Sequence, residues 1–262
     1  MSLLVGTNHA DILPGTPNGS PGQDAILGLG GNDTLVGGGA GDLILAGAGG
    51  DAVFGEAQPA PLNGFSPLSD PTGDNLIFAG AGDDSVSAGV GADTVFGGAG
   101  DDTVFGGFTS SFGFSQGVAS LNFTLDRGDV LFGGAGDDLL DGAGGDDTLL
   151  GGAGDDTLVG GVGVDVLTGG PGADTFRFGG IGGGPVPDTG VGEGNRDTIT
   201  DFREGEDRID LTFLSFGGPA TWSAEPDGGD TIVRVTTAGP EPRVGEIELL
   251  GAHQLGDGDF IV

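Results

Sequence analysis

A nine-residue unit, G-G-x-G-x-D-x-U-x with U a large apolar residue, recurs through most of this chain. The stretch GGAGDDTLVGGVGVDVLTGGPGADTFRF, from Gly151 to Phe178, contains three successive copies. Such units form three blocks, at residues 6–54, 70–105 and 124–177, and the fourteen clean copies are too many for chance. One large apolar residue per unit cannot build a core alone, so the period predicts a fold of stacked repeats.

Each unit divides into a strand and a turn. A segment such as DTLV, at residues 156–159, favours a short strand. The five Gly-rich residues reverse the chain because glycine adopts positive φ freely. Two units then complete one coil, and residues eighteen apart stack at about 4.8 Å. The predicted fold is all-β: a right-handed parallel β-roll with a C-terminal β cap.

Two interruptions and a different tail complete the organisation. Residues 55–69 break the phase of nine and contain three prolines, which predicts an excursion on the surface. Residues 106–123 keep the phase, so they form either a further coil without Asp or a loop of matching length. The repeat stops at Arg177, after which apolar and polar residues alternate, as in strands. We therefore assign residues 1–177 to the roll and 178–262 to the cap.

The composition excludes several classes of protein. Forty acidic and seven basic residues give a formal net charge of -33, which argues against nucleic acid as a partner and against anionic lipid unless a cation intervenes. Gly excess and high charge are typical of disorder, but a fixed offset between Asp and the apolar residue is not. The chain has no Cys for disulfides and no apolar run of membrane-spanning length. Its start lacks the features of a secretory signal peptide.

The Asp at position six of the unit predicts metal sites. Stacking places like carboxylates about 4.8 Å apart, where each pair repels by a few kcal/mol, so a metal-free roll should be unstable. Carboxylate and carbonyl oxygens in an open turn suit Ca²⁺ better than Mg²⁺ or Zn²⁺. The predicted ligands, paired eighteen apart and weakest at the asparagine, are Asp24, Asp33, Asp42, Asp51, Asn75, Asp84, Asp93, Asp102, Asp129, Asp138, Asp147, Asp156, Asp165 and Asp174. The preceding acids of the D-D pairs are expected to point outward: Asp83, Asp101, Asp137, Asp146 and Asp155.

These units resemble the RTX family, the hemolysin-type calcium-binding repeats. The segment from ADTFRF to RIDL resembles the cap of serralysin-type proteases and of the R-modules of alginate epimerases, and the ending DFIV resembles a type I secretion signal. The resemblance implies export by a type I secretion apparatus and folding on external calcium. The zinc motif of serralysins, H-E-x-x-H, is absent from the sequence.

No catalytic pattern stands out. GFSQG fits the G-x-S-x-G pattern at Ser115, but only His9 and His253 could serve as a base, and we interpret Ser115 as a loop residue and His253 as a surface residue. We expect a secreted, non-enzymatic calcium-binding protein, with extracellular polysaccharide as a further partner. One alternative is a membrane-active protein using Phe108, Phe112, Phe114 and Phe123, and another is an accessory module of an enzyme encoded elsewhere.

Overall fold

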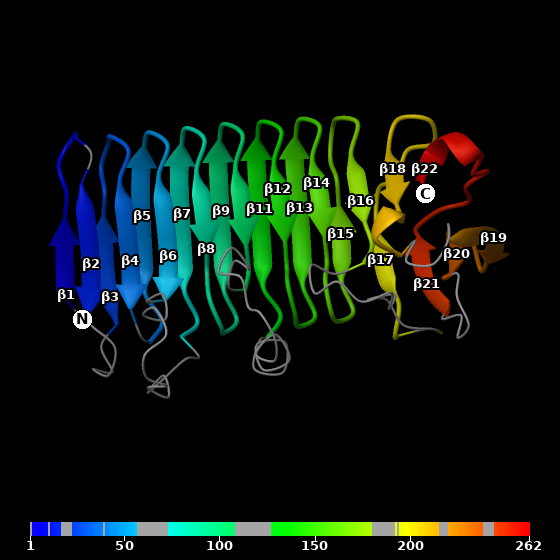
Figure 1. Ribbon diagram of the computed structural model, residues 1–262, viewed down its shortest axis with the longest axis horizontal. Helices are drawn as coiled ribbons and strands as arrows, with labels where there is room; N and C mark the ends of the chain where they lie inside the picture. The colour runs from blue at the N-terminus through cyan, green and yellow to red at the C-terminus, as the bar shows by residue number, and fades with distance from the viewer. Residues whose placement is uncertain are drawn as a thin grey trace.

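The computed structural model describes residues 2–9, 11–16, 23–38, 40–56, 73–107, 127–179, 192, 194–214, 220–237 and 244–262. Short strands stack along one long axis, with the N-terminus at one end and the cap at the other (Figure 1). Successive strands alternate between two sheets, so each coil contributes one strand to each sheet. The molecule is an all-β parallel β-roll, as the period predicted.

The first sheet has twelve strands and contains the odd-numbered strands of the roll. Its order is β1 (Ser2–Val5), β3 (Asp24–Leu27), β5 (Leu43–Ala48), β7 (Leu76–Ala81), β9 (Thr94–Ala99), β11 (Val130–Ala135), β13 (Thr148–Ala153), β15 (Val166–Thr168), β17 (Asp197–Ile199), β21 (Val244–Leu249), β20 (Asp230–Thr236) and β19 (Thr221–Asp227).

The second sheet has ten strands, all in parallel pairs. Its order is β2 (Ile12–Thr16), β4 (Thr34–Gly38), β6 (Ala52–Glu56), β8 (Ser85–Ser87), β10 (Thr103–Phe105), β12 (Leu139–Asp141), β14 (Thr157–Val159), β16 (Thr175–Arg177), β18 (Arg208–Asp210) and β22 (Phe260–Ile261). Two 3₁₀ turns lie near the cap, η1 (Thr212–Leu214) and η2 (Asp257–Asp259).

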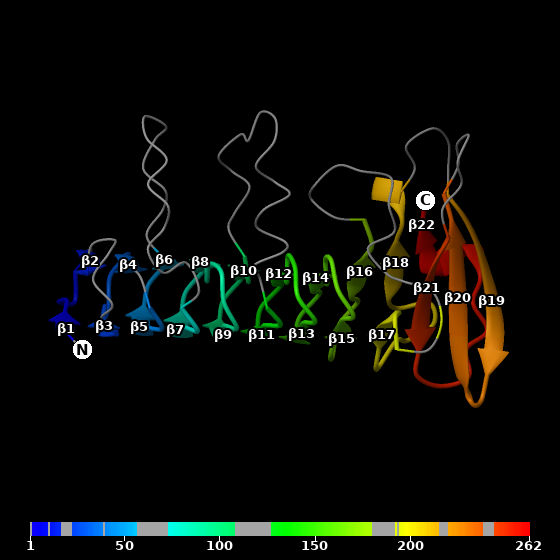
Figure 2. The same ribbon diagram turned by 90° about the horizontal axis from the view of Figure 1, so that it is seen from below.

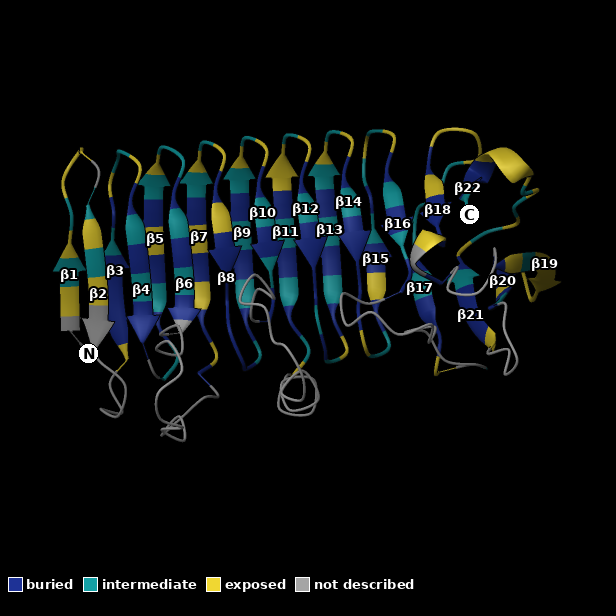
Figure 3. Ribbon diagram, in the orientation of Figure 1, coloured by how far each residue is buried: buried dark blue, intermediate teal, exposed yellow. Residues whose placement is uncertain are grey.

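The core is one column of apolar side chains from each sheet. The residue at position eight of each unit points inward and is fully buried, as for Leu131 and Leu140. Figure 3 shows the buried colour continuing from coil to coil along the roll. At the end of β11 and in the turn that follows it, Gly134 (φ 125°) and Gly136 (φ 135°) take backbone conformations that other residues rarely adopt.

Strand pairing decides what the two interruptions are. β5 pairs directly with β7 across residues 55–69, and the predicted excursion lies almost wholly outside the described residues. β9 pairs directly with β11, with Thr94 opposite Val130, so residues 106–123 do not insert a further coil. This removes the coil alternative, and the three blocks form one continuous roll.

The parallel ladders continue beyond Arg177. β17 stacks on β15 and β18 stacks on β16, so a further coil follows the last clean repeat. β21 and β22 then close this end, and β19 and β20 extend the first sheet as an antiparallel hairpin (Figure 2). Trp222 stacks on Phe260 with ring centroids 4.0 Å apart, inside the cap.

Candidate metal centres

The position-six residues form two continuous ladders, one along each edge of the roll. The backbone N–H of each one donates to Oδ1 of the corresponding residue in the next coil, as Asp138 does to Asp156 at 2.8 Å. The ladders also cross the interruptions, where Asp102 donates to Asp138 at 2.8 Å. All fourteen predicted ligand residues lie in these ladders, and all are buried.

The second carboxylate oxygen of many ladder residues has no hydrogen-bond partner in the described part of the chain. A buried acceptor left in this state is costly, and a buried charge costs more. These atoms are the Oδ2 atoms of Asp33, Asp42, Asp51, Asp84, Asp93, Asp102, Asp138, Asp156 and Asp174. They require a partner that the described ranges of the chain do not provide.

Five of these oxygens, those of Asp33, Asp42, Asp102, Asp138 and Asp156, lie beside a backbone carbonyl from the neighbouring coil. A Cβ built on Gly133 would come within 2.3 Å of Asp138 Oδ2 and 2.5 Å of the Gly151 carbonyl oxygen. The same convergence occurs at Gly151, beside Asp156 Oδ2 and the carbonyl of Gly169. In these units the glycine at position one leaves the room into which both oxygens converge, whereas Ala46, Ala79 and Ala88 occupy position one before Asp51, Asp84 and Asp93.

These donors fit calcium. They are hard oxygen ligands from two coils, in an arrangement without His or Cys. Within the described ranges, no three His, Cys, Asp or Glu side chains gather into one metal-binding group, so backbone carbonyls would have to supply the remaining ligands.

Burial raises the pKa of the ladder carboxyl groups, and neighbouring carboxylates raise it further, although the hydrogen bond from the adjacent coil acts in the opposite direction. The pKa is about 7 for Asp84, Asp93 and Asp156, and about 6 for Asp42, Asp102, Asp138 and Asp174. At neutral pH, ladder carboxyl groups of the metal-free chain therefore ionise in surroundings that disfavour the ionised form. A bound divalent cation would favour the ionised form instead.

Asn75 differs from the other ladder residues. Its Oδ1 accepts the Asp42 N–H at 2.8 Å, but its Nδ2 donates to the Ala88 carbonyl at 3.2 Å. An amide nitrogen thus occupies the place of a carboxylate oxygen and saturates the carbonyl. This geometry is consistent with the predicted weaker site, which stays a prediction.

The position-five acids of the D-D pairs are exposed, as expected. Their side chains also accept hydrogen bonds from the next coil, which their position in the repeat does not predict. Asp137 Oδ1 accepts the Asp155 N–H at 2.8 Å, and Asp101 Oδ1 accepts the Asp137 N–H at 3.0 Å. An outer ladder therefore runs beside the inner one.

Three ladder residues lie outside the predicted ligand set: Asp11, whose N–H donates to Asp33 Oδ1 at 2.8 Å, Asp197 and Asp207. Asp197 Oδ1 accepts the Asp165 N–H at 2.9 Å, and Asp207 Oδ1 accepts the Asp174 N–H at 3.0 Å. Both retain the D-x-U signal, as D-T-I and D-R-I, but the full G-G-x-G pattern is lost, with Gly192 and Gly194 before Asp197 and only Gly205 before Asp207. Asp207 Oδ2 also accepts the Arg203 N–H at 2.7 Å, so this end of the ladder is satisfied by the cap.

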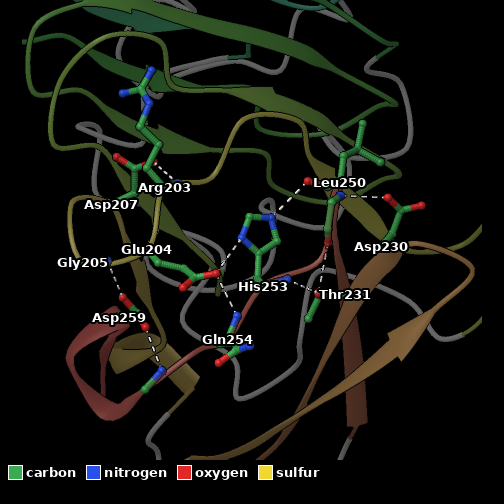
Figure 4. A network of polar contacts seen from close by, with 12 residues as sticks. Arg203, Glu204, Gly205, Asp207, Asp230, Thr231, Leu250, His253, Gln254 and Asp259 are labelled. Atoms are coloured by element: carbon green, nitrogen blue, oxygen red, sulfur yellow. Dashed lines mark hydrogen bonds and ion pairs between the residues drawn. The ribbon is translucent and has the colours of Figure 1, made fainter.

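A polar network joins the cap to the last coil (Figure 4). Glu204 Oε1 accepts the Gln254 N–H at 2.8 Å and lies 3.4 Å from His253 Nδ1. His253 Nε2 lies 3.0 Å from the Leu250 carbonyl, and its ring packs edge-on against Phe202. His253 is partly buried, with 12% of its side chain exposed, and its contacts join the cap to the last coil. Ser115 and the Phe set at 108–123 lie outside the described residues.

A two-sheet roll with oxygen ladders along its turns defines a calcium-binding repeat solenoid. The family model for the RTX calcium-binding nonapeptide repeat matches residues 18–57, 72–104, 123–158 and 150–180. The chain belongs to this family, and it is a calcium-binding repeat protein.

Several solved structures are similar to this chain. The R3 subunit of the AlgE6 mannuronan C5-epimerase from Azotobacter vinelandii is 31% identical over 52% of this chain and 73% of its own, with a TM-score of 0.29. The R2 subunit is 29% identical over 62% of this chain and 88% of its own, also at 0.29. The extracellular lipase LipA from Serratia marcescens is 19% identical over 99% of this chain and 39% of its own, at 0.23. No curated protein matches the chain.

Proposed function

We propose that this protein is a secreted, non-enzymatic RTX protein that folds when it meets extracellular calcium. The observation that carries the proposal is the row of buried Asp Oδ2 atoms without a hydrogen-bond partner in the described part, five of them beside a carbonyl of the next coil. Without a cation these charges oppose stacking, and with one they join adjacent coils. Folding and calcium binding are then one equilibrium.

This coupling suits export through a type I secretion apparatus. Extracellular calcium modules bind with Kd of about 10⁻⁴–10⁻³ M, so the sites would stay empty in the cytosol and fill outside. The chain would cross the envelope unfolded and close its ladders afterwards. Among the described residues, no helix is long and apolar enough to cross a membrane.

Polysaccharide association is the second part of the proposal. It is supported by the similarity to two R subunits of a mannuronan epimerase, of which the R3 subunit is 31% identical. A rigid roll at the cell surface would present the cap and the sheet faces to extracellular polymer. Retention on immobilised polysaccharide in calcium, but not in EDTA, tests this part by itself.

The decisive experiment is a calcium titration followed by far-UV circular dichroism. We expect a cooperative gain of β signal at millimolar calcium, reversed by EDTA, with calorimetry reporting several bound ions. An EDTA-treated chain that keeps its full β signal would overturn the proposal. A β signal that appears equally with magnesium would show that the sites do not select calcium.

A membrane-active role is a second candidate, favoured by one surface. The outer face of the first sheet carries Leu45, Leu76, Phe78 and Val166, each 38% exposed. Phe78, Phe96 and Phe132 stack along it with centroids 4.8 and 4.7 Å apart. Calcium-dependent leakage of liposomes, reduced in Phe78→Ser, would support this role, and intact liposomes would exclude it.

A further inference from the structure

We propose that the cap contains a binding site for an uncharged sugar residue, between the β19–β20 hairpin and the turn that precedes β17. The inference rests on the polysaccharide part of the proposed function and specifies its ligand. The site is a cavity of about 310 Å³, lined by residues of the hairpin and by Arg196. This volume lies at the lower end of the range for small-molecule sites.

Arg196 is the group that points to a ligand. Its side chain is 93% buried, since only 7% is exposed, and its Nε has no hydrogen-bond partner among the described residues. Two carboxylates lie close but beyond hydrogen-bond distance, with Asp227 Oδ2 at 3.8 Å from Nη2 and Glu248 Oε2 at 3.9 Å from Nε. A buried guanidinium with an unused donor is unfavourable unless something else accepts from it.

The opposite wall is already satisfied and rigid. Arg234 donates to Glu246 Oε1 from Nη2 at 2.7 Å and from Nε at 3.2 Å. Glu246, in β21, also accepts the Gly192 N–H at 2.8 Å through Oε2, which ties β21 to the segment before β17. The Arg234 guanidinium holds the pKa of Glu246 below its usual value, so this pair stays ionised. The wall is therefore preorganised.

The lining alternates donors and acceptors. Arg196 and Arg234 donate, Glu225 and Asp227 accept, and Ile232 adds an apolar surface. A hydroxyl group both donates and accepts, so a sugar ring can satisfy both kinds of group while its C–H face lies on the apolar surface. The rim carboxylates and the net charge of -33 repel an anionic sugar, and Arg196 repels a cation. The chemistry favours a neutral hexose unit over a uronate.

The test uses the full chain in millimolar calcium, after circular dichroism has confirmed the β signal. The probes are maltotetraose, cellotetraose, mannotetraose and tetramannuronate, measured by saturation-transfer NMR and calorimetry. We expect at least one neutral tetrasaccharide to bind, and tetramannuronate to bind more weakly. Asp227→Ala and Arg196→Gln should each weaken binding about tenfold or more. Asp227 is 63% exposed, so its removal should leave the fold intact.

Glu206→Ala is the matched control, because Glu206 is an exposed acid outside the cavity. It should leave binding unchanged within about twofold. A folded chain that binds none of the neutral probes, or that prefers tetramannuronate, would refute the sugar site and leave calcium binding intact. Equal losses in Asp227→Ala and Glu206→Ala would refute it too. A chain without a calcium-dependent β signal would instead refute the proposed function.

Discussion

Asp138→Asn tests whether the ladder carboxylates oppose folding until a cation binds. Asparagine retains Oδ1, which accepts the Asp102 N–H at 2.8 Å. Asp138 Oδ2 is buried without a hydrogen-bond partner, and it approaches Gly133 together with the Gly151 carbonyl. An amide nitrogen in its place would donate to that carbonyl, as Asn75 does at the equivalent position. The substitution thus repairs the metal-free site and removes a calcium ligand.

The two effects have opposite signs and different calcium dependence. Replacing the unsatisfied oxygen should raise the free energy of unfolding of the metal-free chain by about 1–3 kcal/mol. Loss of one site removes a stabilisation that grows by about 1.4 kcal/mol per tenfold calcium above Kd. For a gain of about 2 kcal/mol, wild type and variant are equally stable at about 30 times Kd. With Kd of about 10⁻⁴ M, this crossing falls at about 3 mM calcium.

Urea unfolding, followed by far-UV circular dichroism over a calcium series, measures both effects. An osmolyte added equally to every sample would populate the metal-free fold in EDTA. Asp137→Asn is the matched control, since Asp137 is exposed and its Oδ1 acceptor for the Asp155 N–H is retained. It should change the free energy of unfolding by less than about 0.5 kcal/mol and keep the wild-type slope. An Asp138→Asn variant that is less stable in EDTA, or that keeps the wild-type slope, would contradict the reasoning.

Three further predictions follow from the same ladders. Asn75→Asp should increase the number of bound calcium ions by one, as measured by calorimetry. It should also destabilise the metal-free chain, because an unsatisfied carboxylate oxygen replaces an amide that donates a hydrogen bond. An unchanged number of bound ions would contradict this prediction. Acidification from pH 8 to pH 5 in EDTA should increase the β signal. The folded pKa values of about 6 to 7 exceed the ordinary 3.8, so the folded chain binds protons at a higher pH than the unfolded chain and is stabilised as the pH falls. A β signal that decreases over this range would contradict the prediction. Gly133→Ala should lower the calcium affinity of one site without abolishing it, because its Cβ would displace Asp138 Oδ2 and the Gly151 carbonyl, while Ala46, Ala79 and Ala88 are accommodated at the same position of other units. Gly258→Ala meets nothing within 4 Å and should bind like wild type, so an equal calcium affinity in both variants would contradict the prediction.

Much of the calcium site could be predicted because the repeat is local and strict. Side chains along a strand alternate between its two faces with a period of two. Position eight therefore faces inward when position six lies in the turn. This places every U residue in the core and every position-six Asp at an edge, as Leu140 and Asp138 illustrate. Asp197 and Asp207 were missed because the turns before them no longer match the full glycine pattern of the repeat, although the ladder continues through them.

The sequence by itself determined the all-β class, the two-unit coil and the residues along the ladders, because these depend only on spacing within one coil. Only the tertiary structure decided which coils meet. Residues 106–123 match the phase of the repeat, so spacing allowed both interpretations, and the pairing of Thr94 with Val130 excluded one of them. The cavity around Arg196 likewise combines residues from the turn before β17 and from the hairpin. Contacts of this kind join segments without a fixed spacing, so only packing between coils and cap specifies them.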